Sequence, residues 1–216
     1  MNYKAVIFDM DGILLDTESI CDRTWTMAAD QFHLDPEKAA KAITLCRGTN
    51  KNGTRAVIKQ SFGQDFDVDT FLAKTSELFY YIEETEGIKL MPHVIEALDY
   101  IKNKGYKMAL ASSTRQTSVI RQLTNAGLIS YFETITTGDM VEHGKPDPEI
   151  YLKACKSIGL DPKDCIAIED SPNGLRSAKS AGLSTIMIPD LIPYTDDLKP
   201  IADTVIDSFN EIYSLL

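Results

Sequence analysis

Two aspartates separated by a single residue follow a short apolar run near the start of the chain. The apolar residues are 6–8, Asp9 and Asp11 come directly after them, and Asp16 lies slightly further on. Two carboxylates about 4 Å apart repel each other by roughly 4 kcal/mol at an effective dielectric constant near 20. A cation, protonation or exposure to water must therefore offset this cost.

Polar residues also follow three later apolar segments. They are Ser112, Ser113 and Thr114 after residues 109–111, Lys145 within His143-Gly144-Lys145-Pro146-Asp147, and Glu169 with Asp170 after residues 166–168. An aspartate can attack phosphorus to form an aspartyl-phosphate, and a second carboxyl group can move the proton. Mg²⁺ prefers carboxylate oxygens, while lysine and hydroxyl groups can hold phosphoryl oxygens. Together these residue types predict phosphoryl transfer.

The elements that must position these residues alternate between β-type and helical patterns. Strands are expected at residues 4–9, 107–112, 134–137, 165–169 and 184–188, with a weaker one at 203–206. Amphipathic helices are expected at 93–104 and 148–158. Alternating units predict an α/β fold, a doubly wound parallel sheet with helices on both faces. Ligands bind such sheets outside the carboxyl ends of the strands, which is where the polar residues fall.

The segment between the first and second strands has a different pattern. Residues 17–87 show no clear strand, but three or four helical patterns that break near 33–35, 48–53 and 63–69. We therefore predict an inserted α-helical cap domain at residues 17–87. The remaining residues, 1–16 and 88–216, would form the α/β core domain.

Composition limits the classes of protein to consider. With 44% hydrophobic and 25% charged residues, the 216-residue chain fits a globular domain rather than a disordered one. Its net charge of -10 argues against nucleic acid as a partner, and no stretch has about 18 consecutive apolar residues. Cys21, Cys46, Cys155 and Cys165 show neither a C-x-x-C spacing nor a zinc pattern. We expect a cytoplasmic monomer with reduced thiols and no membrane partner.

The motifs resemble those of the haloacid dehalogenase superfamily, in the subgroup that contains β-phosphoglucomutase and many sugar-phosphate phosphatases. The matching pieces are Phe8-Asp9-Met10-Asp11-Gly12, Ala111-Ser112-Ser113-Thr114, Gly144-Lys145-Pro146-Asp147-Pro148 and Glu169-Asp170-Ser171 with Asn173-Gly174. They occur in the family's order, and the resemblance spans nearly the whole chain. Each piece is weak by itself, but together they are highly specific.

The resemblance implies a role for each matching residue. Asp9 would be the nucleophile and Asp11 the general acid and base. Ser112, Ser113 and Lys145 would bind the phosphoryl group. Mg²⁺ would be held by Asp9, the Asp11 backbone carbonyl and Asp170, with Glu169 in its immediate surroundings. Substrate specificity is expected in the cap, where the candidates are Thr17, Arg47, Gly48 and Lys51.

Two activities fit this set of residues. The first is a Mg²⁺-dependent phosphatase acting on a small phosphorylated metabolite, with a sugar phosphate as the expected substrate. The second is β-phosphoglucomutase, which returns the phosphoryl group to the sugar. Cys21 stands where the mutase pattern has a cap-entry histidine, which weakens the mutase interpretation. Arg47-Gly48 replaces the mutase's Lys-Gly pair and keeps its positive charge.

Other interpretations of the same residues explain less of the sequence. A phospho-receiver domain would not have its nucleophile on the first strand, and it would lack an inserted cap. A binding protein without catalysis would not need every catalytic position filled. Residues 112–114 could also cap a helix, which is compatible with phosphate binding. His143 is expected to be exposed or structural, and Asp16 is expected at the hinge where the chain enters the cap.

Overall fold

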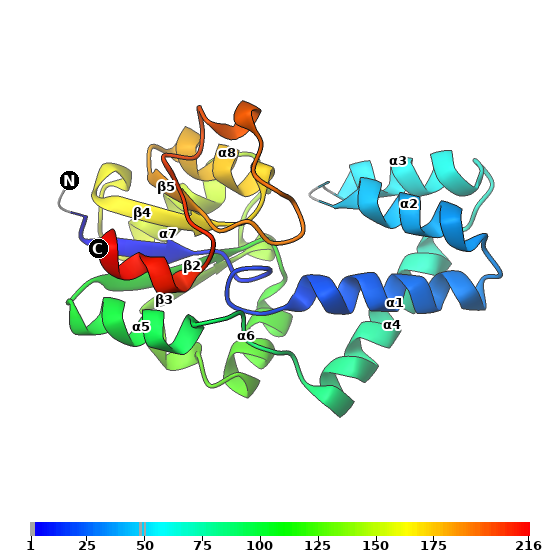
Figure 1. The fold of residues 1–216 in the computed structure, drawn as a ribbon, viewed down its shortest axis with the longest axis horizontal. Helices are drawn as coiled ribbons and strands as arrows, with labels where there is room; N and C mark the ends of the chain where they lie inside the picture. The colour runs from blue at the N-terminus through cyan, green and yellow to red at the C-terminus, as the bar shows by residue number, and fades with distance from the viewer. Residues whose placement is uncertain (1–2, 48, 50) are drawn as a thin grey trace. The chain divides into compact units, whose positions relative to one another are not determined.

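The computed structural model describes residues 3–47, 49 and 51–216. The chain divides into two compact units, which Figure 1 draws as ribbons. We call Met1–Asp16 together with Lys89–Leu216 the core unit, and Thr17–Ile88 the helical unit. Within the described residues, every helix is too short or too polar to span a membrane.

The described residues of the core unit form six parallel strands. These are β1 (Ala5–Phe8), β2 (Lys107–Ser112), β3 (Thr134–Thr137), β4 (Cys165–Glu169), β5 (Ser184–Met187) and β6 (Thr204–Val205). Their order in the sheet is β3-β2-β1-β4-β5-β6, and every neighbouring pair is parallel. The predicted doubly wound parallel sheet is thus confirmed.

The central strand shows why short apolar runs become parallel strands here. All four residues of β1 are buried, because the sheet is covered on both faces. Successive side chains of a strand point to opposite faces. Ile7 belongs to an apolar cluster with Ile150 and Tyr151 on one face. Phe8 points to the other face and meets Phe132, with ring centroids 5.9 Å apart.

Helices complete the two layers that cover the sheet. α7 (Glu149–Ser157) and α8 (Pro172–Ala181) supply buried residues to the cluster around Ile7. On the other face, Phe8 also meets Phe209 of η5 (Phe209–Ser214), against which α5 (Val94–Asn103) packs. The remaining elements are α6 (Gln116–Asn125), η1 (Ile129–Tyr131), η2 (Gly138–Met140), η3 (Pro162–Asp164) and η4 (Asp196–Leu198).

The described residues of the helical unit form four helices around an aromatic core. The helices are α1 (Thr17–Gln31), α2 (Pro36–Cys46), α3 (Lys51–Phe62) and α4 (Val68–Glu86). Asp35 and Asp67 begin α2 and α4, and each side chain accepts a backbone hydrogen bond from the first turn. Trp25 packs edge-on against Phe71, with ring centroids 5.4 Å apart. Trp25 is therefore a core residue of this unit.

Candidate active site

The sheet topology brings the polar residues together at one edge. β1 lies between β2 and β4, and the chain leaves it toward β2 first and reaches β4 later, so the strand order reverses there. The carboxyl ends of strands at such a reversal are where open α/β sheets bind ligands. Asp9 directly follows β1, Ser112 ends β2 and Glu169 ends β4.

A buried lysine joins two of these carboxylates. The Lys145 Nζ lies 2.6 Å from Asp9 Oδ1 and 2.6 Å from Glu169 Oε1. All three side chains are less than a tenth exposed, so water does little to screen the contacts. Burial raises the pKa of Asp9 to about 8; Glu169 and Asp11 add to this rise, and Lys145 opposes it. Although burial acts to lower it, the carboxylates of Asp9 and Glu169 raise the pKa of Lys145.

Glu169 is held on both of its oxygens. Its Oε1 accepts a hydrogen bond from the Tyr151 hydroxyl at 2.7 Å as well as the contact from Lys145. Its Oε2 accepts from the Ser171 hydroxyl at 3.1 Å and the Ser171 N–H at 3.3 Å. A Cβ added to Gly174 would lie 1.9 Å from Oε1, so only glycine leaves room for the carboxylate. These contacts orient Glu169 toward Lys145.

Asp11 has a different environment from Asp9. Its Oδ2 accepts hydrogen bonds from the Thr114 hydroxyl at 2.9 Å and the Ser112 hydroxyl at 3.3 Å. The hydroxyls of Ser112 and Thr114 do not cap α6, the helix that follows. At its start, the N–H of Gln116 donates to the side chain of Asp139 instead. One carboxylate is thus paired with a cation and the other with hydroxyls, the kind of difference that gives two acids separate roles.

The donor set fits a hard divalent cation. Asp9, Glu169 and Asp170 each offer a carboxylate oxygen, and these oxygens lie within 4.8 Å of one another. All three residues are buried, at 6%, 0% and 8% exposure. Lys145 supplies one positive charge against three carboxyl groups, so protonation or a further cation must offset the rest. Carboxylate oxygens without nitrogen or sulfur donors are the set that Mg²⁺ and Ca²⁺ prefer.

Other predicted residues of the core unit lie outside this set of contacts. Ser113 is exposed, and its backbone carbonyl packs so closely against Gly138 that a Cβ there would lie 2.1 Å from it. Thr114, which belongs to the same predicted hydroxyl cluster but was given no separate role, donates its hydroxyl to Asp11. His143 is exposed and its Nδ1 faces Glu149 at 3.4 Å. The N–H of Asp16 donates to Lys89 at the boundary of the two units.

The predicted substrate residues belong to the helical unit. Thr17 is buried at the start of α1, and Arg47 forms an ion pair with Asp22. The hydroxyl oxygens of Thr49 and Thr54 lie 2.9 Å apart and share a hydrogen bond. Gly48 lies outside the described residues, as does the side chain of Lys51, the first residue of α3.

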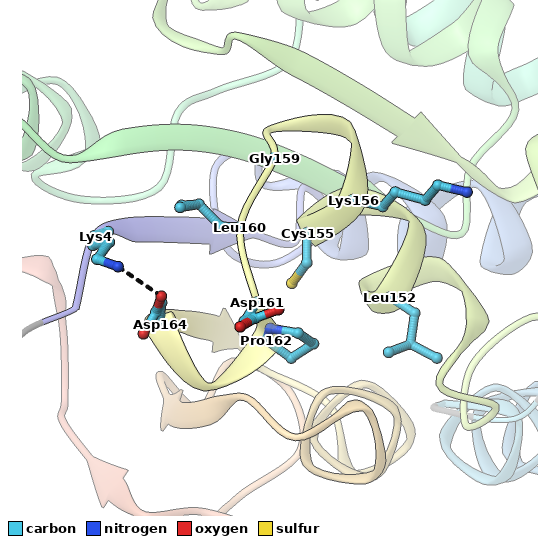
Figure 2. A pocket seen from close by; sticks show the side chains of 9 residues that line it. All are labelled: Lys4, Leu152, Cys155, Lys156, Gly159, Leu160, Asp161, Pro162 and Asp164. Atoms are coloured by element: carbon cyan, nitrogen blue, oxygen red, sulfur yellow. Dashed lines mark hydrogen bonds and ion pairs between the residues drawn. The ribbon is translucent and has the colours of Figure 1, made fainter.

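A separate hollow lies at the opposite end of the strands. It has a volume of about 520 Å³, and Figure 2 shows its lining side chains, which include Cys155, Leu152 and Lys156. Lys4 and Asp164, which form an ion pair at 2.8 Å, directly precede β1 and β4. The hollow is therefore at the amino ends of the strands. The candidate active site lies at their carboxyl ends.

The raised pKa of Asp9 makes the metal-free protein lose stability as pH rises. A carboxyl group whose pKa is raised on folding favours the folded state when protonated, and this contribution disappears between about pH 4 and pH 8. In EDTA we expect the unfolding free energy of the wild type to fall by a few kcal/mol from pH 5 to pH 8, relative to Asp9→Asn. Urea unfolding followed by circular dichroism measures this difference. Equal pH slopes for the two proteins would contradict it.

Comparisons with known proteins agree with this geometry. A model of the family "haloacid dehalogenase-like hydrolase" matches residues 6–188. The chain is 33% identical to a phosphorylated carbohydrates phosphatase of Thermotoga maritima, over 85% of this chain and 83% of that protein. It is 29% identical to hexitol phosphatase A of Escherichia coli, over 87% of this chain and 84% of that one.

A solved structure agrees over nearly the whole chain. The crystal structure of CbbY from Rhodobacter sphaeroides, in complex with phosphate, superposes with a TM-score of 0.78 at 28% identity. The match covers 97% of this chain and 96% of that one. Because the family model spans most of the chain, and motif residues from β1 to Asp170 meet at one edge of the sheet, the protein belongs to the haloacid dehalogenase-like hydrolases.

Proposed function

We propose that the protein is a Mg²⁺-dependent phosphatase that acts on a small phosphorylated metabolite, a sugar phosphate, through an aspartyl-phosphate on Asp9. The observation that carries the proposal is the pairing of two differently held carboxylates. Asp9 is fixed by Lys145, whose Nζ lies 2.6 Å from its Oδ1. Asp11, two residues further along the chain, accepts hydrogen bonds from the hydroxyls of Thr114 and Ser112. A nucleophile and a proton carrier are what phosphoryl transfer through a carboxylate requires.

The chain's own groups account for both halves of the reaction. A carboxylate oxygen of Asp9 bonds to phosphorus as the bond to the leaving oxygen breaks, and Asp11 gives that oxygen its proton. Asp11 then takes a proton from a water molecule that attacks the phosphorus, which frees phosphate and restores Asp9. Lys145 and the Ser112 hydroxyl lie beside Asp9 and Asp11, where they can donate to the phosphoryl oxygens.

The metal would be held by Asp9, Asp170 and the backbone carbonyl of Asp11. When bound, Mg²⁺ would offset the negative charge of the carboxylates and of the phosphoryl oxygens. Glu169 would serve this site by anchoring Lys145, since both of its oxygens already accept hydrogen bonds. The helical unit would act as the cap that selects the substrate, with Arg47 as its candidate cation.

A substrate panel tests the proposed activity. Phosphate release is measured with hexose, pentose, hexitol and nucleotide monophosphates, in Mg²⁺ and in EDTA. We expect release from sugar or hexitol phosphates that is lost in EDTA and returns when Mg²⁺ is added. Activity confined to nucleotides would contradict the sugar-phosphate assignment, and full activity in EDTA would contradict the metal requirement.

The competing activity is that of a β-phosphoglucomutase. A mutase must keep water away from the aspartyl-phosphate until a sugar hydroxyl arrives. Cys21 provides neither the charge nor the ring nitrogen of the histidine expected there. This difference favours hydrolysis.

We therefore predict that β-glucose 1-phosphate is hydrolysed and little of it becomes glucose 6-phosphate. Both products are followed with a trace of the 1,6-bisphosphate present. Isomerisation that outruns phosphate release tenfold, about 1.4 kcal/mol in barrier height, would establish the mutase instead.

A further inference from the structure

A second acidic residue faces Asp170 across Gly12. Gly12 has a φ of +73°, and a Cβ added to it would lie 2.8 Å from Asp170 Oδ2 and 3.3 Å from Asp190 Oδ2. Both carboxylate oxygens therefore lie within 3.3 Å of the position that a Cβ on residue 12 would occupy. The two carboxylates share a small space that only glycine leaves open.

The sheet brings Asp190 to this position. Asp190 comes three residues after the end of β5, the strand next to β4, so it lies at the same carboxyl edge as Glu169 and Asp170. The N–H of Ile188 donates to the Glu169 carbonyl at 2.8 Å, which fixes the start of the segment. The Asp190 Oδ2 atom is buried. It therefore gains little screening from bulk water.

Asp190 is not itself in ligand position. The oxygens that lie within 4.8 Å of one another come from Asp9, Glu169 and Asp170. A buried carboxylate just outside such a set still attracts a divalent cation, because a Coulomb interaction falls only with the inverse of distance. It can also accept a hydrogen bond from a water molecule on the metal, in the way that outer residues tune metal sites.

We propose that Asp190 is a positioning residue of the metal site, which tightens Mg²⁺ binding by its charge without coordinating the ion. The proposal rests on the Mg²⁺-dependent function proposed above. The carboxylate of Asp190 repels that of Asp170 when no metal is present, and a bound divalent cation attracts both. Its contribution therefore appears in metal affinity before any substrate is present.

The test is the dissociation constant for Mg²⁺ alone, measured by isothermal titration calorimetry on the full chain after EDTA treatment and dialysis. We expect Asp190→Asn to raise this constant about tenfold. Asp190→Glu, which keeps the charge, should stay close to the wild type. Asp170→Asn, which removes a proposed ligand, should abolish measurable binding.

The matched control is Asp196→Asn, because Asp196 is exposed at the start of η4, shortly after Asp190 in the chain, and the change in net charge is identical. We expect it to change the constant less than about twofold, since exposed charges are screened by water and salt. The unfolding midpoint in EDTA shows whether Asp190→Asn still folds. Relief of the repulsion from Asp170 should leave this midpoint at or above that of the wild type.

The outcomes separate this inference from the proposed function. If the wild type binds Mg²⁺ and the dissociation constant of Asp190→Asn equals that of Asp196→Asn, the inference is wrong and the proposed function stands. If Asp190→Asn unfolds in EDTA while Asp190→Glu folds and binds Mg²⁺ about tenfold more weakly than the wild type, the inference is also wrong. A wild-type protein that binds no Mg²⁺ would contradict the proposed metal requirement and this inference with it.

Discussion

Asp9→Asn is expected to abolish turnover while leaving the fold intact. The amide is nearly the same size as the carboxylate and can still accept the hydrogen bond from Lys145, which lies 2.6 Å from Oδ1. It cannot act as the nucleophile, so no aspartyl-phosphate can form. Removing a nucleophile that works together with its partners costs at least about 10³-fold in kcat. Phosphate release in saturating Mg²⁺ measures the loss.

The control for this variant is Asp164→Asn, which makes the same chemical change at the other end of the sheet. Asp164 pairs with Lys4 beside the hollow of Figure 2, at the amino ends of the strands, whereas the candidate active site lies at their carboxyl ends. We expect Asp164→Asn to keep near wild-type activity. Matching circular dichroism spectra would show that both variants fold. If Asp9→Asn kept near wild-type phosphate release, the covalent mechanism would be wrong.

Gly174→Ala is expected to damage both stability and activity. Alanine is normally favoured over glycine within a helix by up to about 1 kcal/mol. Here, however, its Cβ would lie 1.9 Å from Glu169 Oε1 and 2.1 Å from Oε2. The Glu169 side chain cannot move away from this Cβ without losing its hydrogen bonds to Tyr151, Ser171 and Lys145. We therefore expect unfolding to become easier by about 2 kcal/mol.

The same displacement should reach Asp9 through Lys145. Since Glu169 and Asp9 share the Lys145 ammonium, moving one carboxylate moves the cation away from the other, and kcat/KM should fall about 100-fold, roughly 2.7 kcal/mol. Gly144→Ala is the matched control for stability, because a Cβ at Gly144 meets nothing within 4 Å. We expect it to change the unfolding free energy by less than about 0.5 kcal/mol. A Gly174→Ala protein more stable than the wild type would show that the contact is not tight.

The strands could be predicted because parallel strands buried on both faces leave a plain signal. Residues 4–9 were expected as a strand, and β1 spans Ala5–Phe8 with every residue buried. Three strands begin and end at the expected residues. They are β2 at 107–112, β3 at 134–137 and β4 at 165–169. Even the weak run at 203–206 contains β6. The helices expected at 93–104 and 148–158 are each one residue shorter at either end.

The residues of the candidate site that belong to a motif could be predicted from the sequence. Residues that reach the site only through the packing of helices and strands could not. Tyr151 lies within the helix expected at residues 148–158, but that helical pattern does not predict that its hydroxyl donates to Glu169. That contact depends on how α7 packs on β4, which periodicity does not reveal. Ser113 was predicted to bind the phosphoryl group and Thr114 was given no separate role, yet the loop conformation after β2 turns the Thr114 hydroxyl toward Asp11. Asp190 lies beside Asp170 only because β5 pairs with β4.

The central claim is that a phosphoryl group passes through Asp9, and Asp11→Asn tests it most directly. With p-nitrophenyl phosphate the leaving group needs little protonation, so Asp9 can still be phosphorylated, while the loss of the Asp11 base slows hydrolysis of the intermediate. In saturating Mg²⁺ we predict a burst of one p-nitrophenolate per protein chain, followed by slow turnover. Mass spectrometry of the acid-quenched protein should then find one phosphoryl group, located on Asp9. Steady release of p-nitrophenolate with no burst and no phosphorylated protein would contradict the account.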